Sequence, residues 1–543
     1  MDRYHVQSNN YWSSTEYDSN NAWNVNMNNG NVNNNNKDNN NYVWPVRSDN
    51  DSLRLFSFEN IYKQYLKCRK NKRNTVNALR FEINCEENLF DLKRQLDTGS
   101  YYPSRSVCFM AVKPKLREIF AADLKDRIVH HILVDYLEKI FEPKFIFDSY
   151  ACRKDKGIHA GVTRLRSFVR KATKNGSRNA FYMQLDIKNY FMSIDKKILF
   201  DLIAAKVTDE RVLNLASKLI FHDCTNNYVL KGDRDYLKKI ASQKSLFFTG
   251  GKKGLPIGNL TSQFFANVYL NELDQFVKHR LKCRYYLRYC DDFVMLSDSR
   301  EALLKWKDEI TVFLAERLGL SLNENRQRLQ PVTNGINFLG YIVRKDYLLV
   351  RRRVVNNLRE KLSYFEKRLV TDDKPPYVRV MYDYELLEKL RATLASYFGH
   401  FRWANTFRLK KSLLERYGFL NWFFTIEGWK IIPKYKMPVK IPTLKLQYRY
   451  FKGKFPEDVI FFRKGKYYEF FGDDTDTALK LGLKKMNRHS DRNTKYGFPI
   501  WLEKSFSERI KQLGRSLTVI TEGGRYLTGI KERFPKYRLV AQL

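Results

Sequence analysis

Three aspartates are the residues of this chain whose types and spacing could support metal-dependent chemistry. Asp291 and Asp292 are adjacent between two apolar and aromatic runs in residues 284–297, RYYLRYCDDFVMLS, a pattern that predicts a β-hairpin with carboxylates at its tip. Neighbouring ionised carboxylates repel, so a divalent cation with a preference for hard oxygen ligands, such as Mg²⁺, would stabilise the pair. A turn that uses Asp only because Asp favours turns is the alternative.

The third aspartate follows a second strand pattern. Residues 181–195, FYMQLDIKNYFMSID, predict a strand that places Asp186 at its polar end. Two strands of one sheet can bring Asp186 together with Asp291 and Asp292 around two metal ions. Such a site activates an attacking hydroxyl and stabilises a leaving pyrophosphate in an in-line displacement.

These two motifs together resemble the palm motifs of reverse transcriptases. The family has an Asp followed five residues later by an aromatic, here Phe191, and a Y-x-D-D hairpin, here residues 289–292. The resemblance implies an α/β right-hand polymerase with fingers, palm and thumb. It implies catalysis by Asp186, Asp291 and Asp292, which would hold two Mg²⁺ ions together with Ile187, with Mn²⁺ as a substitute.

The same resemblance implies the substrates. Template RNA, the cDNA/RNA hybrid and deoxynucleoside triphosphates are the expected partners. Phe191 stands where the family places the bulky side chain that excludes a ribose 2′-hydroxyl, which implies deoxynucleotide use. An ordinary core aromatic is the alternative for Phe191.

Composition agrees with a nucleic-acid enzyme. The 543 residues predict several domains, and 98 Lys plus Arg against 59 Asp plus Glu give a formal charge of +39, which requires a polyanionic partner. Aromatic residues make up 15% of the chain and lie among the basic ones, which favours nucleic acid over an anionic membrane. No run of 18 apolar residues and no signal-peptide pattern is present, and the seven Cys form no C-x-x-C pair, so we expect no membrane partner and a cytoplasmic location.

Two basic segments belong to the expected fingers. Residues 111–119 predict a short basic hairpin, followed by a helix within residues 122–141. The reverse transcriptase resemblance implies that Lys113 and Arg117 hold the incoming triphosphate. Residues 147–161, FDSYACRKDKGIHAG, resemble the second fingers motif, which implies that Arg153 and Lys156 lie near template or nucleotide phosphates.

Residues 254–263, GLPIGNLTSQ, indicate a particular kind of reverse transcriptase. Their two glycines and proline impose a backbone that can approach a base pair closely, and an amphipathic helix follows. The I-G-x-x-x-S-Q form resembles the reverse transcriptases of diversity-generating retroelements, which misincorporate opposite adenine. It implies that Ile257 and Gly258 contact the nucleotide and that Ser262 and Gln263 contact template or primer.

The expected primer grip and thumb follow. Residues 337–341, NFLGY, match the turn that grips the primer end, which implies roles for Phe338, Leu339 and Gly340. Arg326 stands where a Lys is commoner, which puts a proton-donating role there in doubt. Residues 349–432 are helical and basic in pattern. We therefore expect fingers and palm over 51–345 and a thumb over 346–440.

Four prolines between 433 and 456 mark a boundary before a small mixed α/β domain at 441–543. This domain resembles the N-terminal mismatch-reading domain of the MutS family. The resemblance makes Tyr467 and Glu469 the candidates for a wedge that stacks on a mispaired base and hydrogen-bonds its edge. A basic clamp that has lost mismatch reading is the alternative. No G-x-x-x-x-G-K-[ST] motif is present, so the ATPase of that family is not expected.

Residues 1–50 differ from the rest, with sixteen Asn between positions 9 and 41. Their polarity predicts a disordered segment. The pattern also resembles the last strands of a C-type-lectin-like or formylglycine-enzyme-like fold with its variable positions turned to Asn. Because a polymerase that errs at adenine turns AAC and AAT codons into NNY, which excludes stop codons, the DNA encoding residues 8–47 is predicted to overlap a template repeat.

The sequence thus predicts RNA-templated synthesis of adenine-mutagenised cDNA in a diversity-generating retroelement, with an accessory nucleic-acid-binding protein as a further partner. A reverse transcriptase of retron or antiphage type is one alternative, and an adjacent gene with a near-copy of residues 11–47 would separate the two. An RNA-binding scaffold with a silent polymerase is the other alternative. The three intact aspartates argue against that scaffold.

Overall fold

The computed structural model describes most of the chain after residue 53. Described are residues 54–70, 75–112, 115–437, 441, 443–472, 474–484, 496–527 and 529–541, and the backbone of three strands nearer the N-terminus. The chain divides into two compact units, which are described separately. The first holds Met1–Asp155, Met183–Met295 and Arg300–Arg328, and the second holds Lys156–Tyr182, Leu296–Ser299 and Leu329–Leu543.

The three N-terminal strands form an antiparallel sheet in the order β1-β2-β3. They are β1 (Asn10–Glu16), β2 (Asn21–Asn26) and β3 (Val32–Asn36). Composition alone did not predict these strands, although they fall in the stretch that resembles the last strands of a lectin-like fold. The remaining residues predicted as disordered up to position 50 lie outside the described part.

The first unit begins with helices that pack on one buried helix, α5. Ser57 caps α2 by accepting a hydrogen bond from the Asn60 amide, and Asp123 caps α5 by accepting one from the Lys125 amide. Helix α5 is apolar on most sides, which allows α2, α3, α9 and α11 (Leu260–Gln275) all to pack against it. These helices are α2 (Phe58–Arg69), α3 (Val76–Ile83), α4 (Cys85–Asp97), α5 (Leu124–Phe141) and α9 (Glu210–Phe221).

The predicted basic hairpin forms part of a three-stranded sheet in the order β5-β4-β7. Its strands are β4 (Ser106–Ala111), β5 (Arg117–Ala121) and β7 (Tyr228–Lys231). The register runs from Val107 opposite Ala121 to Ala111 opposite Arg117, so the hairpin is confirmed for the described residues. Lys113 and Pro114 at its tip lie outside them.

A second sheet, in the order β10-β6-β9-β8, carries the aspartates. Its strands are β6 (Phe181–Asp186), β8 (Tyr285–Tyr289), β9 (Asp292–Ser297) and β10 (Arg328–Pro331). The neighbouring helices are α7 (Tyr190–Ser193), α8 (Lys196–Ala204), α10 (Asp235–Lys238), α11 (Leu260–Gln275), which continues as the π-helix η5 (Phe276–Arg280), and α12 (Arg300–Leu318). Helix α11 is buried on nearly every side, because it passes through the centre of the unit.

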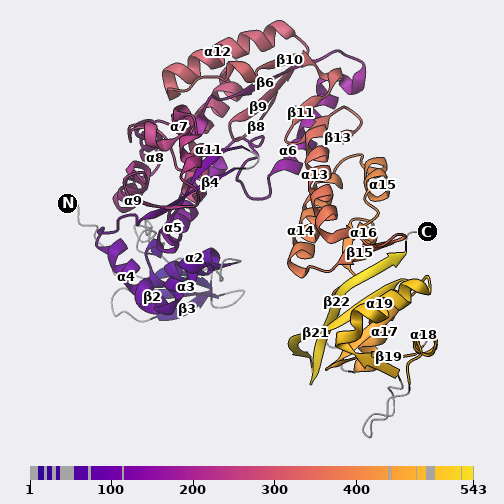
Figure 1. Cartoon of the computed structure of the whole chain (residues 1–543). Helices are drawn as coiled ribbons and strands as arrows, with labels where there is room; N and C mark the ends of the chain where they lie inside the picture. The colour runs from indigo at the N-terminus through magenta and orange to yellow at the C-terminus, as the bar shows by residue number, and fades with distance from the viewer. Residues whose placement is uncertain are drawn as a thin grey trace. The chain divides into compact units, whose positions relative to one another are not determined.

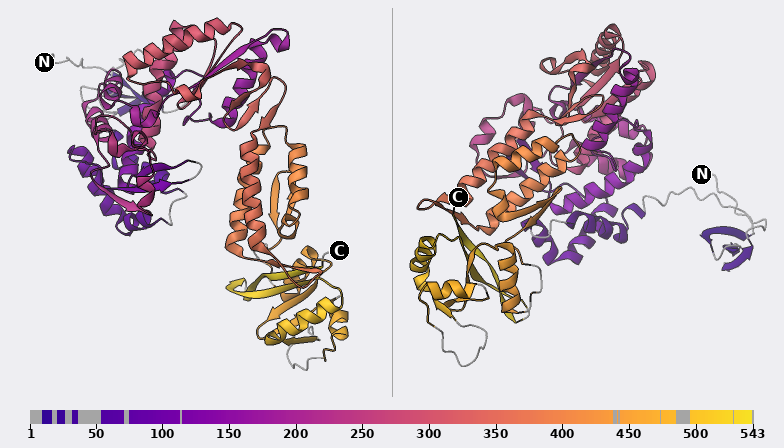
Figure 2. Two further views of the ribbon diagram at one scale, coloured as in Figure 1. Left: turned by 45° about the horizontal axis from the view of Figure 1, so that its top comes forward. Right: turned by 90° about the vertical axis from the view of Figure 1, so that its right-hand side faces the viewer.

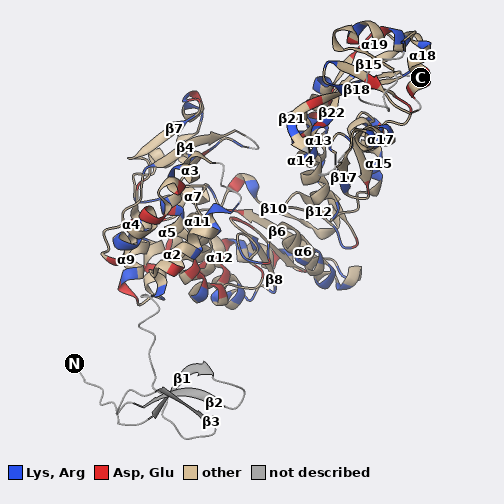
Figure 3. Cartoon of the chain, turned by 90° about the horizontal axis from the view of Figure 1, so that it is seen from below, with Lys and Arg blue, Asp and Glu red and all other residues tan. Residues whose placement is uncertain are grey.

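The second unit contains the expected thumb. Its helices are α6 (Ile158–Ala172), α13 (Arg352–Leu369), α14 (Tyr384–Phe401), α15 (Phe407–Arg416) and α16 (Leu420–Phe423). A small sheet lies between α6 and α13 in the chain and is formed by β11 (Ile336–Phe338), β12 (Tyr341–Val343) and β13 (Leu348–Val350). The hairpin of β16 (Phe424–Glu427) and β17 (Lys430–Pro433) follows α16. Lys and Arg on α13 and α15 can be followed in Figure 3.

A seven-stranded sheet in the order β14-β15-β22-β21-β18-β19-β20 forms the rest of this unit (Figures 1 and 2). Its strands are β14 (Val370–Asp372), β15 (Tyr377–Met381), β18 (Val459–Lys464), β19 (Tyr467–Phe470), β20 (Tyr496–Pro499), β21 (Leu517–Leu527) and β22 (Ile530–Ala541). Helices α17 (Leu444–Lys454), α18 (Asp474–Lys480) and α19 (Glu503–Gln512) accompany them. The predicted mixed α/β character of the C-terminal region is confirmed, since strands β18 and β19 are followed by helix α18.

The C-terminal strands share a sheet and a core with the thumb. Strand β15 pairs with β22, from Tyr377 opposite Ala541 to Met381 opposite Tyr537. One apolar cluster includes Leu358, Leu390 and Phe398 from α13 and α14 together with Phe451, Phe462 and Ile520. The boundary predicted at residue 441 therefore falls inside one compact unit. No helix among the described residues is long and apolar enough to cross a membrane.

If the C-terminal strands and the thumb share one core, a substitution on β18 should lower the stability of the thumb helices. Phe461 and Phe462 are neighbours on β18 and are equally buried, but Phe462 packs in the cluster of the thumb helices and Phe461 packs against the opposite face of the sheet. We expect Phe462→Ala to destabilise the unit by about 3–5 kcal/mol and to lower amide hydrogen-exchange protection in α14. Phe461→Ala is the matched control, and equal loss of α14 protection in both variants would contradict a shared core.

Candidate active site

The structure brings the three aspartates to one end of two adjacent strands. Asp186 ends β6, Asp292 begins β9, and Asp291 lies in the turn between β8 and β9. The amide of Ile187 donates a hydrogen bond to the Asp291 carbonyl at 3.2 Å, which holds the two strand ends together. Cys290 adopts a left-handed φ of 57° in the turn. The predicted carboxylate hairpin is therefore present.

A buried ion pair supports this turn from below. Arg288 on β8, which is 1% exposed, donates to Asp274 on α11 through Nη2 at 2.6 Å and Nε at 2.8 Å. Its Nη1 donates to the carbonyl of Cys290 at 3.0 Å. Burial opposes the charge of Arg288, but Asp274 outweighs it and raises the pKa of the guanidinium above its ordinary value. The charged Arg288 thus fixes the backbone just before Asp291.

The carboxylates carry charge in an unfavourable environment. Burial, and next the charge of Asp186, raise the pKa of Asp291. Burial, with further contributions from Asp186 and Asp291, raises the pKa of Asp292 to about 7, although a hydrogen bond from Gln184 opposes the shift. These shifts mean that ionising Asp291 and Asp292 together is unfavourable without a neighbouring cation.

Polar side chains that the sequence reasoning missed surround the aspartates. Gln184 Nε2 donates to Asp292 at 3.0 Å and 3.3 Å, to one carboxylate oxygen each. Asn323 Nδ2 donates to Asp186 at 2.9 Å. The alternation of strand β6 was the available signal for Gln184, because residues 184 and 186 point to the same face of a strand.

Cations also gather here. Arg326 Nη1 lies 3.4 Å from the Asp186 carboxylate, so the Arg that replaces the commoner Lys forms an ion pair with a catalytic candidate. Partial burial, and next the charges of Arg326 and Arg117, lower the pKa of Lys115. The charge of Arg117 makes a smaller contribution that opposes the raised pKa of Asp291. The described end of the basic hairpin therefore lies within electrostatic range of the carboxylates. The triphosphate role of Arg117 stays a prediction, and Lys113 lies outside the described residues.

Phe191 and Ile257 pack against the same apolar cluster, which consists of Cys108, Phe120, Met192, Cys224 and Leu246. The carbonyl of Phe191 accepts a hydrogen bond from the Leu255 amide at 2.8 Å. The loop of residues 254–258 thus lies beside α7, which follows the strand carrying Asp186. Two residues predicted to contact the nucleotide share one environment.

Gly258 lies against strand β5. It adopts φ 122°, and a Cβ there would stand 2.8 Å from Ile119 Cγ2 and 3.3 Å from the Phe120 carbonyl oxygen. The Phe120 amide donates to the carbonyl of Ile257 at 3.0 Å. Only glycine therefore permits the loop backbone to lie this close to β5. This packing explains why position 258 is a glycine, without a direct contact to the nucleotide.

The residues predicted to contact template or primer in the first unit have different environments. Ser262 is buried in the first turn of α11, whereas Gln263 is exposed. Arg153 donates to Glu142 at 2.8 Å and to the carbonyls of Ile146 and Ser149 at 2.7 Å and 2.9 Å. These hydrogen bonds mean that Arg153 stabilises its own loop. Binding a phosphate would require Arg153 to break them.

The remaining primer and template candidates belong to the second unit. Lys156 precedes Gly157, which adopts φ 113° at the start of α6. Phe338 is buried, and Leu339 and Gly340 form the turn between β11 and β12 with positive φ angles of 49° and 91°. A Cβ on Gly340 would lie 3.1 Å from the His400 ring, so α14 supports this turn. Because the Phe338 side chain is buried, it belongs to the core and not to a surface that contacts primer or template.

The two wedge candidates lie on β19 but differ in access. Tyr467 begins the strand and is partly exposed, whereas Glu469 is 1% exposed. Lys464 Nζ lies 3.7 Å from the Glu469 carboxylate. In this structure Glu469 does not reach a surface where it could meet a base edge, because it faces the interior of its domain.

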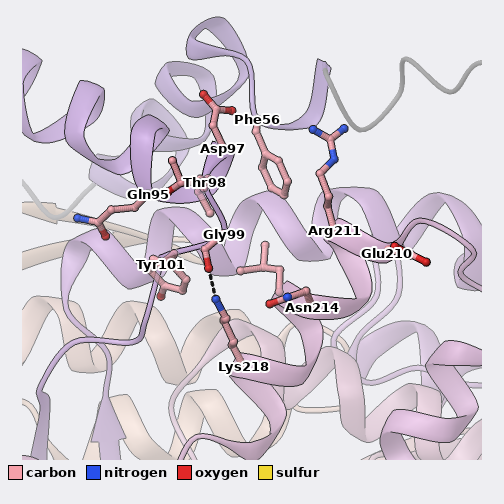
Figure 4. Close-up of a pocket in the computed structure, with 12 residues that line it drawn as sticks. Phe56, Gln95, Asp97, Thr98, Gly99, Tyr101, Glu210, Arg211, Asn214 and Lys218 are labelled. Atoms are coloured by element: carbon pink, nitrogen blue, oxygen red, sulfur yellow. Dashed lines mark hydrogen bonds between the residues drawn. The ribbon is translucent and has the colours of Figure 1, made fainter.

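A pocket of 260 Å³ lies elsewhere in the first unit, between the C-terminal end of α4 and helix α9 (Figure 4). Lys218 donates to the carbonyl of Gly99 across it. The residues that line it are Phe56, Gln95, Leu96, Asp97, Thr98, Gly99, Tyr101, Glu210, Arg211, Asn214, Leu215 and Lys218. It contains none of the residues predicted for catalysis.

The fold and the carboxylates define a class: nucleic-acid polymerases of right-hand architecture. Residues 111–343 match the family model described as reverse transcriptase (RNA-dependent DNA polymerase), and residues 442–522 match the model of MutS domain I. The chain therefore carries a reverse transcriptase domain and a MutS domain I, and its enzyme class is RNA-directed DNA polymerase.

Several known proteins are similar to this chain. Protein YkfC of Escherichia coli (strain K12) is 25% identical over 331 residues, which cover 54% of this chain and 81% of YkfC. The group II intron-encoded protein LtrA of Lactococcus lactis subsp. cremoris is 24% identical over 324 residues, covering 48% of this chain and 50% of LtrA. A structure of apo telomerase from Candida tropicalis, truncated from its C-terminal domain, matches with a TM-score of 0.34 and 12% identity, covering 46% of this chain and 55% of that chain. The chain thus spans about half the length of LtrA.

The packing of Gly258 generates a prediction. We expect Gly258→Ala to displace β5 and with it Arg117, adding about 1–3 kcal/mol of strain to the 1–2 kcal/mol that a left-handed alanine costs. The variant should melt earlier and show a raised KM for deoxynucleoside triphosphates. Gly250→Ala is the control, because Gly250 also has a positive φ but no atom within 4 Å of its added Cβ. Equal behaviour of the two variants would contradict the role of close packing.

Proposed function

We propose that this protein copies an RNA template into DNA at the site formed by Asp186 and Asp291. The observation that carries the proposal is the placement of two mutually repelling carboxylates, buried Asp186 at the end of β6 and half-buried Asp291 in the turn before β9, inside a reverse transcriptase domain. Like charges held together in this way are typical of sites that meet a cation during function.

The donor set fits Mg²⁺ or Mn²⁺. Carboxylate oxygens of Asp186 and Asp291 and the carbonyl of Ile187 are hard ligands. Among the residues that the structure describes, no group of three or more His, Cys, Asp or Glu side chains is arranged to hold a metal. A site with two carboxylates still suits Mg²⁺, which commonly completes its shell with water and substrate phosphates. When bound, two such ions would activate the primer hydroxyl and neutralise the leaving pyrophosphate.

The chain's own cations supply the remaining charge. Arg117 and Lys115, from the hairpin of β4 and β5, lie within electrostatic range of the aspartates, and Arg326, from the segment after α12, forms an ion pair with Asp186. A triphosphate bound beside the carboxylates would meet all three, which would offset its negative charge and orient it. Lys113 is proposed to contribute from the tip of the same hairpin. Gln184 would orient Asp292, which makes it a positioning residue.

The carboxylate proposal is tested by removing one charge at a time. We expect Asp186→Asn and Asp291→Asn each to abolish Mg²⁺-dependent primer extension while RNA binding stays nearly intact, because phosphate contacts do not need the metals. Primer extension and filter binding on the same RNA measure the two properties. Asp201→Asn, on an exposed helix face, is the control. Extension that persists in the Asp186→Asn, Asp291→Asn double variant would contradict catalysis at these aspartates, whereas no extension by the unsubstituted protein would favour the silent RNA-binding scaffold.

The finer proposal is mutagenic copying of a template RNA in a diversity-generating retroelement. Its support is the I-G-x-x-x-S-Q motif and the place of Ile257 in the apolar cluster beside Phe191. An apolar side chain there offers no hydrogen bond to help position the nucleotide, so base selection would loosen. Phe191 in the same environment is proposed to exclude ribonucleotides. A retron-type or antiphage reverse transcriptase remains the second candidate.

Ile257 provides the test of this finer proposal. We expect Ile257→Gln to lower misincorporation opposite adenine in cDNA, because the amide restores a polar contact beside the nascent pair. Ile257→Leu keeps an apolar side chain of the same size and should leave the error spectrum unchanged. Sequencing of cDNA made from one defined RNA measures both. An error spectrum that is the same in all three enzymes would remove Ile257 from fidelity control.

A further inference from the structure

One end of the C-terminal sheet gathers exposed aromatic and basic side chains from three separate segments. Strand β18 ends at Lys464, and the turn after it carries Lys466. Strand β20 runs antiparallel to β19, so Pro499 lies opposite Tyr467 and the following residue Trp501 lies at the same end. We call this end, defined by Lys466, Trp501, Arg525, Tyr526 and Lys531, the aromatic end.

The third segment reaches this end through the parallel pairing of β18 and β21. Phe462 lies opposite Ile520, so residues 523–527 of β21 extend past the turn at Gly465. The Gly465 amide donates to Glu522 Oε1 at 3.1 Å, which confirms that the turn and the start of this extension are in contact. Arg525 and Tyr526 therefore project beyond the sheet with the hairpin of β21 and β22.

The side chains at the aromatic end are available to a partner and carry the right charge for a polyanion. Trp501 is 70% exposed and Tyr526 is 62% exposed. Lys531 lies over the Tyr526 ring, with its Nζ 5.9 Å from the centroid. Two acidic residues lie on this hairpin. Glu522 is bound to buried Arg533 at 2.5 Å, so its charge is offset, and Glu532 lies between Lys531 and Arg533 on β22.

We propose that the aromatic end binds single-stranded nucleic acid, with unpaired bases stacked on Trp501 and Tyr526 and phosphates paired with Lys466, Arg525 and Lys531. Bases within a duplex already stack on each other and offer no free ring face, whereas unpaired bases do. Basic side chains track the backbone of such a strand. RNA and DNA share this chemistry, so both are candidate ligands.

The same structure argues against mispair reading at this place. In the resemblance to MutS, Glu469 is the residue that would recognise a base edge, and Glu469 is buried next to Lys464. Burial lowers the pKa of Arg533, and the charges of Glu522 and, to a smaller extent, Glu469 oppose that lowering. The domain thus keeps rings for stacking, and the Glu469 carboxylate is not accessible for discrimination.

The thumb gives this surface a fixed support. Residues 537–541 of β22 pair with β15 of the thumb, while the other end of β22 forms the exposed hairpin with β21. A nucleic-acid strand bound at the aromatic end is therefore held at a constant position relative to the thumb helices. The inference rests on the proposed function, since a template or product strand of the polymerase is the expected ligand.

The test uses the full chain, because the C-terminal strands share their core with the thumb. A 15-nucleotide single strand carrying 5-iodouracil, as DNA and as RNA, is irradiated with the protein and crosslinked peptides are identified by mass spectrometry. We expect crosslinks on the peptides of Trp501 and Tyr526. Trp501→Ala and Tyr526→Ala should each weaken single-strand binding about tenfold, the usual loss for one base stack. Trp501→Phe should retain most of it.

Controls separate this inference from the polymerase assignment. Leu479→Ala removes an exposed side chain on α18 of the same domain and should not change binding. Asp291→Asn should keep the crosslinks, and Trp501→Ala should keep primer extension on a short hybrid. Unchanged affinity of both alanine variants, or crosslinks confined to other peptides, would overturn the proposal. Tighter binding to a mismatched duplex than to the single strand, lost in Glu469→Gln, would overturn it in favour of mispair reading.

Discussion

The ion pair between Arg288 and Asp274 is the interaction on which the carboxylate hairpin depends. It is buried on both sides, and Tyr286 donates a further hydrogen bond to Asp274 at 2.7 Å. An arginine in the interior must have such partners, since leaving one buried charge unpaired typically costs about 3–5 kcal/mol. Because the same guanidinium binds the Cys290 carbonyl, helix α11 and the turn before Asp291 are joined in one network.

Helix α11 links that network to the nucleotide side of the site. It begins directly after the loop of Ile257 and Gly258, and its buried position leaves it little freedom. The loop in turn packs on β5, which carries Arg117 at its start. The carboxylates, the loop of Ile257 and Gly258, and Arg117 are therefore positioned by one helix and the strands beside it, so a disturbance at any of them reaches the others.

The C-terminal region shows how an added domain can become part of an enzyme. Its sheet continues through β15 into the thumb, and its core includes thumb leucines. A domain joined this way moves with the thumb, unlike one on a flexible tether. This attachment, with the accessible aromatic end and the buried Glu469, favours a surface that holds a strand over a device that inspects base pairs.

The sequence by itself determined the chemistry and the local elements. Adjacent aspartates between strand patterns, a glycine-rich loop before a helix and a basic hairpin are local signals, and local periodicity is enough to place them. Tertiary structure alone decided which side chains surround them. Gln184 and Lys115 meet the aspartates, and Arg153 and Glu469 are held within the protein, because contacts between distant segments depend on packing that no local pattern encodes. The pairing of β15 with β22 is likewise a contact that no local pattern encodes, since the two strands are separated by about 160 residues of sequence.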